Sequence, residues 1–124
     1  MQAPSESRTQ RTLQHLRIAK SLPDAVTRSH LADDRVVGWY GDSGVVIDGE
    51  IADQQVPRAL AARFGTDSDP AEFWVRWTQA ECAAKLADVP IALWITRNGL
   101  TAASHDVITL RLDDVVVSVG FPGS

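Results

Sequence analysis

The chain has 124 residues, the size of one ordinary domain that buries a single hydrophobic core. Hydrophobic residues make up 44% of it and charged residues 23%, which excludes a disordered or fibrous protein. The formal net charge is −4 and no run of Lys and Arg occurs, which argues against a nucleic-acid-binding protein.

Cysteine content and hydropathy narrow the class further. The only cysteine is Cys82, so one chain cannot form an internal disulfide or a Cys-based zinc site. The longest apolar runs are far shorter than a membrane span, and the N-terminus is polar rather than signal-like. We therefore expect a cytoplasmic protein, with residues 1–7 disordered and residues 8–124 forming one domain.

The first part of the domain combines a helical pattern with two strand patterns. Apolar residues at helical spacing predict a helix over residues 8–22, which Pro23 ends. Residues 34–40 and 44–48 are rich in strand-forming residues. The sequence "GDSG" between them is a turn signal, so we expect these two strands to form a hairpin.

The middle of the chain predicts two helices. Residues 52–64 have a helical pattern in which Pro57 must lie in the first turn or cause a kink, and Gly65 is a typical stop. The next helix has the clearest start, because Asp69 can cap it, Pro70 fits its first position and Glu72 completes a capping box. Its pattern predicts one buried stripe and a second stripe at the edge of the apolar face. These stripes are Phe73, Trp77, Ala80 and Ala84, and Trp74, Thr78, Glu81 and Lys85.

The part of the chain after Pro90 has patterns that predict strands. Residues 91–97 alternate in character and predict a strand, and "VITLRL" and "VVVSVGF" predict a hairpin around Asp113 and Asp114. Hairpins, a lone strand and two or three helices predict an α+β domain with helices packed on one face of an antiparallel sheet.

Two carboxylates end the apolar strand "VVIDGE". Asp48 and Glu50 are two residues apart, so in an extended strand their side chains point to the same face. Solvent exposure at a strand end is the simpler explanation. The alternative is a hard cation such as Mg²⁺, which is usually held by few carboxylates together with water and substrate phosphates.

The helix sequence "WTQAECAAK" places Glu81 four residues before Lys85. This is the favoured orientation of an ordinary helical ion pair, which contributes only about 0.3–0.5 kcal/mol. His30 precedes a strand pattern, where a lone histidine is more often solvated or structural than functional. Taken singly, none of these residues requires a functional site.

Their order along the chain, however, resembles the 4′-phosphopantetheinyl transferase superfamily. A "SH" pair is followed by a strand ending in "IDGE", then by "LAARFG", then by "FWVRWTQAECAAK". In that family the corresponding motifs are Ser-His, Gly-Val-Asp-x-Glu, Ala-Arg-Arg-Phe and Trp-Ser/Thr-x-Lys-Glu-Ala-x-x-Lys. The resemblance covers residues 21–124 and is greatest to the C-terminal half of the surfactin-synthetase-activating type.

The resemblance implies a function and a set of site residues. It implies Mg²⁺-dependent transfer of the phosphopantetheine arm of coenzyme A to a serine of an acyl or peptidyl carrier protein. In this interpretation Glu81 and Lys85 are catalytic, the latter also as a phosphate contact. The metal ligands would be Asp48, Glu50 and Glu81, and the 3′-phosphate of the nucleotide would be bound by Ser29 and His30, with Arg28 as an outer candidate.

Three differences from the family leave a second interpretation open. The first lysine of the family's helix motif is Ala80 here, and its following alanine is Cys82. The chain also matches one half of a protein about twice as long, so we expect an active form to be a homo-oligomer. The alternatives are a degenerate relative that binds coenzyme A or a carrier protein without transfer, and an unrelated α+β domain with chance matches.

Overall fold

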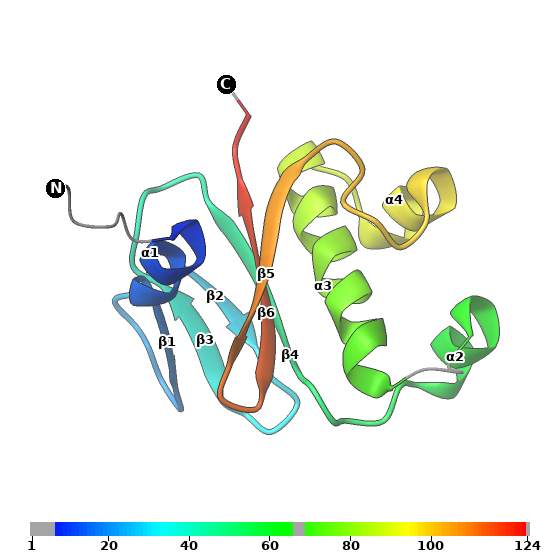
Figure 1. The fold of residues 1–124 in the computed structure, drawn as a ribbon, viewed down its shortest axis with the longest axis horizontal. Coiled ribbons are helices and arrows are strands. Elements are labelled where there is room, and N and C mark those ends of the chain that lie inside the picture. Colours follow the sequence, from blue (N-terminus) through cyan, green and yellow to red (C-terminus); the bar gives the residue numbers. More distant parts are fainter. Residues whose placement is uncertain (1–6, 66–68, 124) are drawn as a thin grey trace, which may run out of the picture.

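The computed structural model describes residues 7–65 and 69–123, which form an α+β fold with two small antiparallel sheets. Figure 1 shows one sheet on one side, the other sheet in the middle and the helices of residues 58–98 beyond it. In chain order the elements are α1 (Arg8–Gln14), β1 (Leu16–Ala19), β2 (Thr27–His30), β3 (Val36–Trp39), β4 (Val46–Ile51), α2 (Arg58–Phe64), α3 (Pro70–Ala87), α4 (Ile91–Asn98), β5 (Asp106–Leu112) and β6 (Val115–Phe121).

Sheet A has the order β1-β3-β2 and sheet B the order β4-β6-β5, with every pair antiparallel. The central strand β6 is buried over six of its seven residues, as its run of valines requires. β5 and β6 form the hairpin predicted around residues 113 and 114, with Asp113 in the left-handed region at φ 54°. This hairpin is the part of the predicted sheet that is confirmed.

Two apolar cores lie on the two faces of sheet B. One core fills the space between the sheets and includes Val37, Ile47 and Val117, all nearly inaccessible to solvent. The other lies among the helices and includes Phe73, Ala80 and Trp94. Sheet B therefore separates an inter-sheet side from a helix side, and this separation decides which side chains can meet.

Helix α3 has the predicted limits, but the Asp69 side chain caps the Ala71 N–H rather than the Glu72 N–H that the predicted capping box requires. The Asp69 carboxylate accepts a hydrogen bond from the Ala71 N–H at 3.0 Å, and Pro70 occupies the first turn. The helix ends at Asp88, which adopts the left-handed conformation at φ 57°, before Pro90. Of the first predicted stripe Trp77 is only half-buried, whereas Trp74 and Thr78 of the second stripe are fully buried.

The predicted helix over residues 8–22 is shorter than expected. Ser7 caps α1 and the helix ends before His15, after which the chain becomes β1. Leu16 pairs with Trp39 across sheet A, so pairing with β3 overrides the local helical pattern. Disorder was expected for residues 1–7, of which Ser7 is ordered as the cap and residues 1–6 lie outside the described residues.

The hairpin predicted through "GDSG" is wrong. β3 belongs to sheet A and β4 to sheet B, so this segment carries the chain from one sheet to the other. The Trp39 indole N–H donates to the Asp42 carbonyl at 2.9 Å, and Gly44 has a φ of 86°. The turn signal was correct, but a turn alone does not specify which strands pair.

Two further predictions need correction. Residues 91–97 form helix α4 rather than a strand, because Ile91, Trp94 and Ile95 have the i, i+3, i+4 spacing that faces the helix-side core. The helix expected over residues 52–64 covers only Arg58–Phe64 and starts directly after Pro57. The single sheet with helices on one face is in fact two sheets, of which sheet B carries α3.

Candidate functional site

Strand β4 directs its two carboxylates toward α3. Gly49 faces sheet A, since a Cβ there would lie 2.9 Å from Val37 Cγ2. By strand alternation Asp48 and Glu50 point to the helix side. Asp48 is the cross-strand partner of Ser118, whose hydroxyl is 2.8 Å from the Thr78 hydroxyl of α3, which confirms this orientation.

Asp48 lies in the most constrained position of the site. Its side chain is buried, and its Oδ1 accepts a hydrogen bond from the Ser29 hydroxyl at 3.4 Å. Its Oδ2 is the one buried side-chain oxygen or nitrogen without a hydrogen-bond partner among the residues that the structure describes. Such an atom normally costs stability, so a group that supplies a positive charge or a donor would relieve it.

The pKa values of Asp48, Glu50 and Glu81 are all raised, and burial is the largest cause for each of them. Burial raises the pKa of Asp48 well above its ordinary range; the Lys85 charge opposes this rise, and the Glu81 and Glu50 charges add to it. Burial, followed by the Glu81 charge, also raises the pKa of Glu50, although the hydrogen bond from Gln54 opposes this. Burial raises the pKa of Glu81, and the Lys85 charge lowers it. The charges of Glu50 and Glu81 thus contribute to the raised pKa of Asp48, whereas the pKa of Glu81 responds to its burial and to Lys85.

Lys85 reaches from α3 across to β4. Its Nζ donates a hydrogen bond to the Ile47 carbonyl at 2.7 Å and lies 3.9 Å from Asp48 Oδ1. The ion pair found for Lys85 in the described residues is thus with Asp48, not with Glu81 as the i, i+4 interpretation expects. About two fifths of this side chain stays exposed, at 41%.

Asp48, Glu50 and Glu81, which the sequence predicted as metal ligands, do not form a metal-binding group by themselves. Within residues 7–65 and 69–123, no group of three or more His, Cys, Asp or Glu side chains has an arrangement that could by itself hold a metal ion. Glu50 is instead hydrogen-bonded to the Gln54 amide at 2.7 Å. Any cation here would need ligands from a substrate or from water, as Mg²⁺ commonly has.

The residues expected to bind the 3′-phosphate are divided by strand β2. Ser29 faces inward, where its hydroxyl accepts the Gly49 N–H at 3.1 Å and donates to Asp48. Arg28 and His30 alternate to the exposed side. The Arg28 guanidinium donates to the carbonyls of Leu22 and Pro23 at 3.0 and 3.1 Å, so it also fixes the loop before β2.

The positions that depart from the family motif lie in the interior. Ala80 is 0% exposed and packs in the helix-side core. Cys82 is also buried, and its Sγ donates to the Ser118 carbonyl at 3.3 Å. Burial, followed by the charge of Asp48, raises the pKa of this thiol, which keeps it protonated.

The sequence reasoning missed a chain of hydroxyls behind Asp48. Ser118 is hydrogen-bonded to Thr78 at 2.8 Å and to Thr109 at 2.7 Å, and the Gln79 amide donates to Thr109 at 2.9 Å. The signal was present, because a lone serine within the apolar run "VVVSVGF" marks a buried polar position that needs partners.

None of the protein families, curated proteins or solved structures compared with the chain matches it. In the part of the chain that the structure describes, no helix has both the length and the apolar character needed to cross a bilayer. The site must therefore be interpreted from its own geometry and from the motifs that the sequence carries.

Proposed function

We propose that the chain is a Mg²⁺-dependent transferase that moves the phosphopantetheine arm of coenzyme A to a serine of a carrier protein. The observation that carries the proposal is the buried Asp48 carboxylate, with one oxygen unpartnered and with Lys85 from α3 beside it. Glu50 and Glu81 lie within electrostatic reach of the same carboxylate. The motif order of the sequence supports the same interpretation.

A divalent cation of the magnesium type is part of this proposal, although the described carboxylates do not form a metal-binding group by themselves. Asp48, Glu50 and Glu81 would hold it, and the phosphates of coenzyme A would complete its ligands, since Mg²⁺ uses few protein carboxylates. When bound, Mg²⁺ would offset the negative charge that builds up on the pyrophosphate during transfer. The unpartnered Asp48 Oδ2 is the atom that such a cation would satisfy.

The chain's own side chains have separate tasks in this proposal. Glu81, half-buried and with a raised pKa, accepts the proton of the attacking serine hydroxyl, because a pKa closer to neutrality makes a carboxylate a better base. The serine oxygen then forms a bond to the phosphorus of the arm, and adenosine 3′,5′-bisphosphate leaves. Lys85, whose side chain is partly exposed, contacts a phosphate with its ammonium. His30, and Arg28 beside it, would hold the 3′-phosphate from the exposed side of β2.

One observation favours the second candidate, a relative that binds coenzyme A or a carrier protein without transfer. The motif lysine is replaced by Ala80, whose side chain is completely buried among apolar residues. A lysine at this position would have to leave that core to reach the carboxylates. The chain consequently offers Lys85 as the ammonium of this helix near Asp48, which weakens charge compensation at the phosphates.

A transfer assay separates the two candidates. The full chain is mixed with coenzyme A, Mg²⁺ and a panel of apo carrier proteins from fatty-acid, polyketide and peptide synthesis. The transferase proposal predicts a mass gain of one phosphopantetheine arm on at least one acceptor, lost when Mg²⁺ is chelated. Coenzyme A binding without any mass gain supports the binding protein instead, and the absence of both binding and transfer contradicts the two proposals together.

A further inference from the structure

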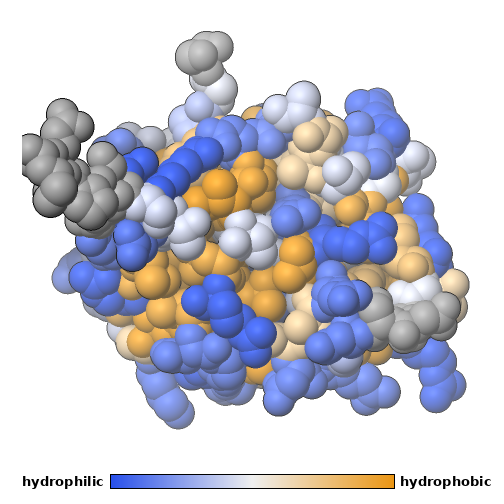
Figure 2. Space-filling view, in the orientation of Figure 1, coloured by the Kyte–Doolittle hydropathy of each residue, from blue (hydrophilic) through white to orange (hydrophobic). Residues whose placement is uncertain are grey.

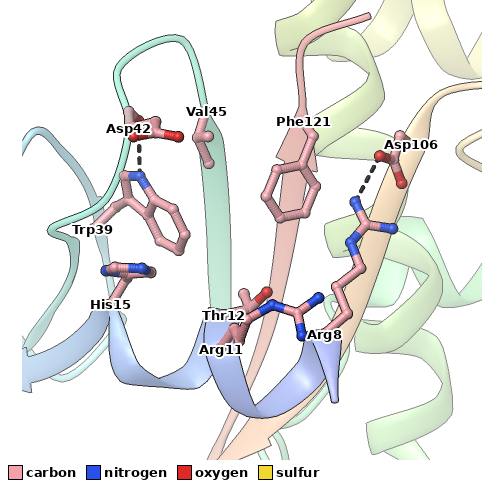
Figure 3. A pocket seen from close by; sticks show the side chains of 9 residues that line it. All are labelled: Arg8, Arg11, Thr12, His15, Trp39, Asp42, Val45, Asp106 and Phe121. Carbon is pink, nitrogen blue, oxygen red and sulfur yellow. Dashed lines mark hydrogen bonds and ion pairs between the residues drawn. The ribbon is translucent and has the colours of Figure 1, made fainter. Parts of the chain in front are cut away.

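A concave site lies on the opposite side of sheet B from the carboxylates. Its volume is about 390 Å³, within the range of small-molecule sites. Helix α1, the segment between β3 and β4, and the ends of β5 and β6 line it, and Figure 3 shows their side chains around one hollow. Trp39 and Phe121 in its wall belong to the inter-sheet core, whereas Asp48 faces α3. The two sites therefore do not share side chains.

The aromatic wall of this pocket is fixed before any ligand arrives. Trp39 is 3% exposed, and its indole N–H is held by the Asp42 carbonyl at 2.9 Å. Its ring lies 5.2 Å from the His15 ring and 6.4 Å from the Phe121 ring. Gly41 passes so close that any Cβ there would overlap the indole. Rings held this rigidly bind a flat partner at little cost in conformational entropy.

Two arginines of α1, with His15 at the end of the helix, lie next to these aromatic rings. Arg8, Arg11 and His15 follow one another at spacings of three and four residues, which places them along one side of the helix. The Arg8 guanidinium lies 4.4 Å from the centre of the Phe121 ring, and its Nη2 is 2.6 Å from Asp106 Oδ2. An exposed ion pair with Asp106 thus holds this guanidinium beside the Phe121 ring. Because exposed ion pairs are weak, the anionic group of a ligand can replace Asp106 as the partner of Arg8.

We propose that this pocket binds a small aromatic anion, a planar ring that carries a carboxylate or a phosphate. The ring lies against Phe121, beside the small exposed part of Trp39, and the anionic group faces Arg8 on α1. A ligand that has only the ring, or only the anionic group, makes only one of these two contacts. The site is separate from the carboxylates of β4 and α3, so the inference does not depend on the proposed transferase function.

The test uses the complete chain and four probes. Phenyl phosphate and benzoate carry both features, inorganic phosphate carries only the charge, and benzyl alcohol carries only the ring. Binding is followed by NMR through the indole N–H signals, of which the chain has four. We expect the aromatic anions to shift the Trp39 signal selectively. Their affinity should be about tenfold higher than that of inorganic phosphate or benzyl alcohol. The better of the two aromatic anions identifies the anionic group.

Two variants change the affinity in opposite directions. Arg8→Gln removes the cation and should weaken phenyl phosphate binding about tenfold, whereas Asp106→Asn releases the guanidinium from its competing carboxylate and should strengthen it. Arg97→Gln on the exposed side of α4 is the matched control and should change nothing. Circular dichroism shows that each variant is folded.

Three results would overturn the inference. The Trp39 signal could stay unchanged at saturating probe, Arg8→Gln and Asp106→Asn could leave the affinity unchanged, or coenzyme A could displace phenyl phosphate from Trp39. The last result would mean that the pocket belongs to the transferase site. If the chain shows no transfer activity, the inference about this pocket still stands, because ligand binding at Trp39 is measured independently of transfer.

Discussion

At the scale of single residues, the burial of Asp48 is the feature that most needs an explanation. Its carboxylate is buried with one oxygen unpartnered, and burial and the charges of Glu81 and Glu50 raise its pKa. A buried ionised group of this kind costs folding free energy unless it is compensated. Lys85 supplies part of that compensation, and a bound cation would supply the rest.

The raised pKa of Asp48 predicts how stability depends on pH. The folded chain keeps the Asp48 proton at pH values where the unfolded chain has lost it, so stability falls as pH rises from the ordinary Asp range through the raised pKa. Asp48→Asn removes this penalty. In denaturant unfolding at neutral pH without divalent ions, it should raise the free energy of unfolding by about 1–2 kcal/mol.

The control for this prediction is Asp53→Asn, because Asp53 is exposed and should behave as an ordinary surface residue. The Asp48→Asn variant should also show a smaller change of stability with pH than the parent chain. A loss of stability in Asp48→Asn would mean that the ion pair with Lys85 outweighs the burial penalty. That outcome would contradict the claim that the buried Asp48 carboxylate lowers stability in the absence of a bound cation.

Glu81 provides a test that separates catalysis from folding. Glu81→Gln keeps the shape of the side chain and removes its charge, so we expect the Mg²⁺-dependent transfer rate to fall by about a hundredfold or more. As a half-buried helix residue it should change the free energy of unfolding by only about 0.5 kcal/mol. Glu72→Gln in the exposed first turn is the matched control. Transfer at the parent rate would show that Glu81 is an ordinary surface residue.

At the scale of elements, the closeness of α3 to sheet B determines whether Lys85 can reach β4. Gly120 on β6 makes this packing possible, because a Cβ there would lie 2.9 Å from both Leu86 Cδ1 and Val46 Cγ2. Gly120→Ala should therefore destabilise the fold by about 1–3 kcal/mol. Gly123→Ala, at a position with no atom within 4 Å, should be nearly neutral.

Thermal or denaturant unfolding of these two glycine variants checks the packing directly. If Gly120→Ala is as stable as Gly123→Ala, α3 does not pack on β6 as closely as described. The same variant should reduce transfer activity more than its stability loss explains, since Lys85 Nζ must stay within 2.7 Å of the Ile47 carbonyl.

The sequence predicted elements best where local signals determine the structure. The limits of α3 follow from Asp69, Pro70 and Pro90, and the β5–β6 hairpin follows from its two apolar runs. Local signals failed where a long-range pairing decides. Residues 16–19 leave a helical pattern to pair with β3, and "GDSG" connects two sheets instead of two paired strands.

For the candidate site, the sequence predicted which residues of β4 and α3 approach each other but not how they interact. Lys85 does lie beside Asp48, yet its pairing with Asp48 and with the Ile47 carbonyl depends on the crossing of helix and strand. The opposite orientations of Ser29 and His30 follow from β2 being a strand up to His30, where the sequence suggested that His30 precedes one. The hydroxyl chain from Ser118 required the strand register.

At the scale of the whole molecule, sheet B divides the chain into two independent sides. Figure 1 shows sheet A and α1 on one side and α3 on the other, and Figure 2 shows hydrophobic and hydrophilic residues together on one face. The carboxylates lie on the helix side, and the aromatic pocket lies at the sheet A side. Under the two proposals, the ligands of the two sites would not compete for the same side chains.

The proposed transferase function carries a prediction about assembly. In the family that the motifs resemble, the coenzyme lies between two halves, so under this proposal we expect a homo-oligomer with a site between copies. Light scattering combined with the transfer assay tests this. Activity should fall on dilution in step with dissociation, whereas a strict monomer with full activity would rule out a shared site.

The central claim is that carboxylates from β4 and α3 bind one divalent cation together with coenzyme A. Electron paramagnetic resonance of Mn²⁺, added as a substitute for Mg²⁺, measures this directly by counting the free ion. The account predicts saturable binding of no more than one Mn²⁺ per chain, strengthened by coenzyme A and lost in both Asp48→Asn and Glu81→Gln. Binding that is absent, or that is unchanged in these two variants, would contradict it.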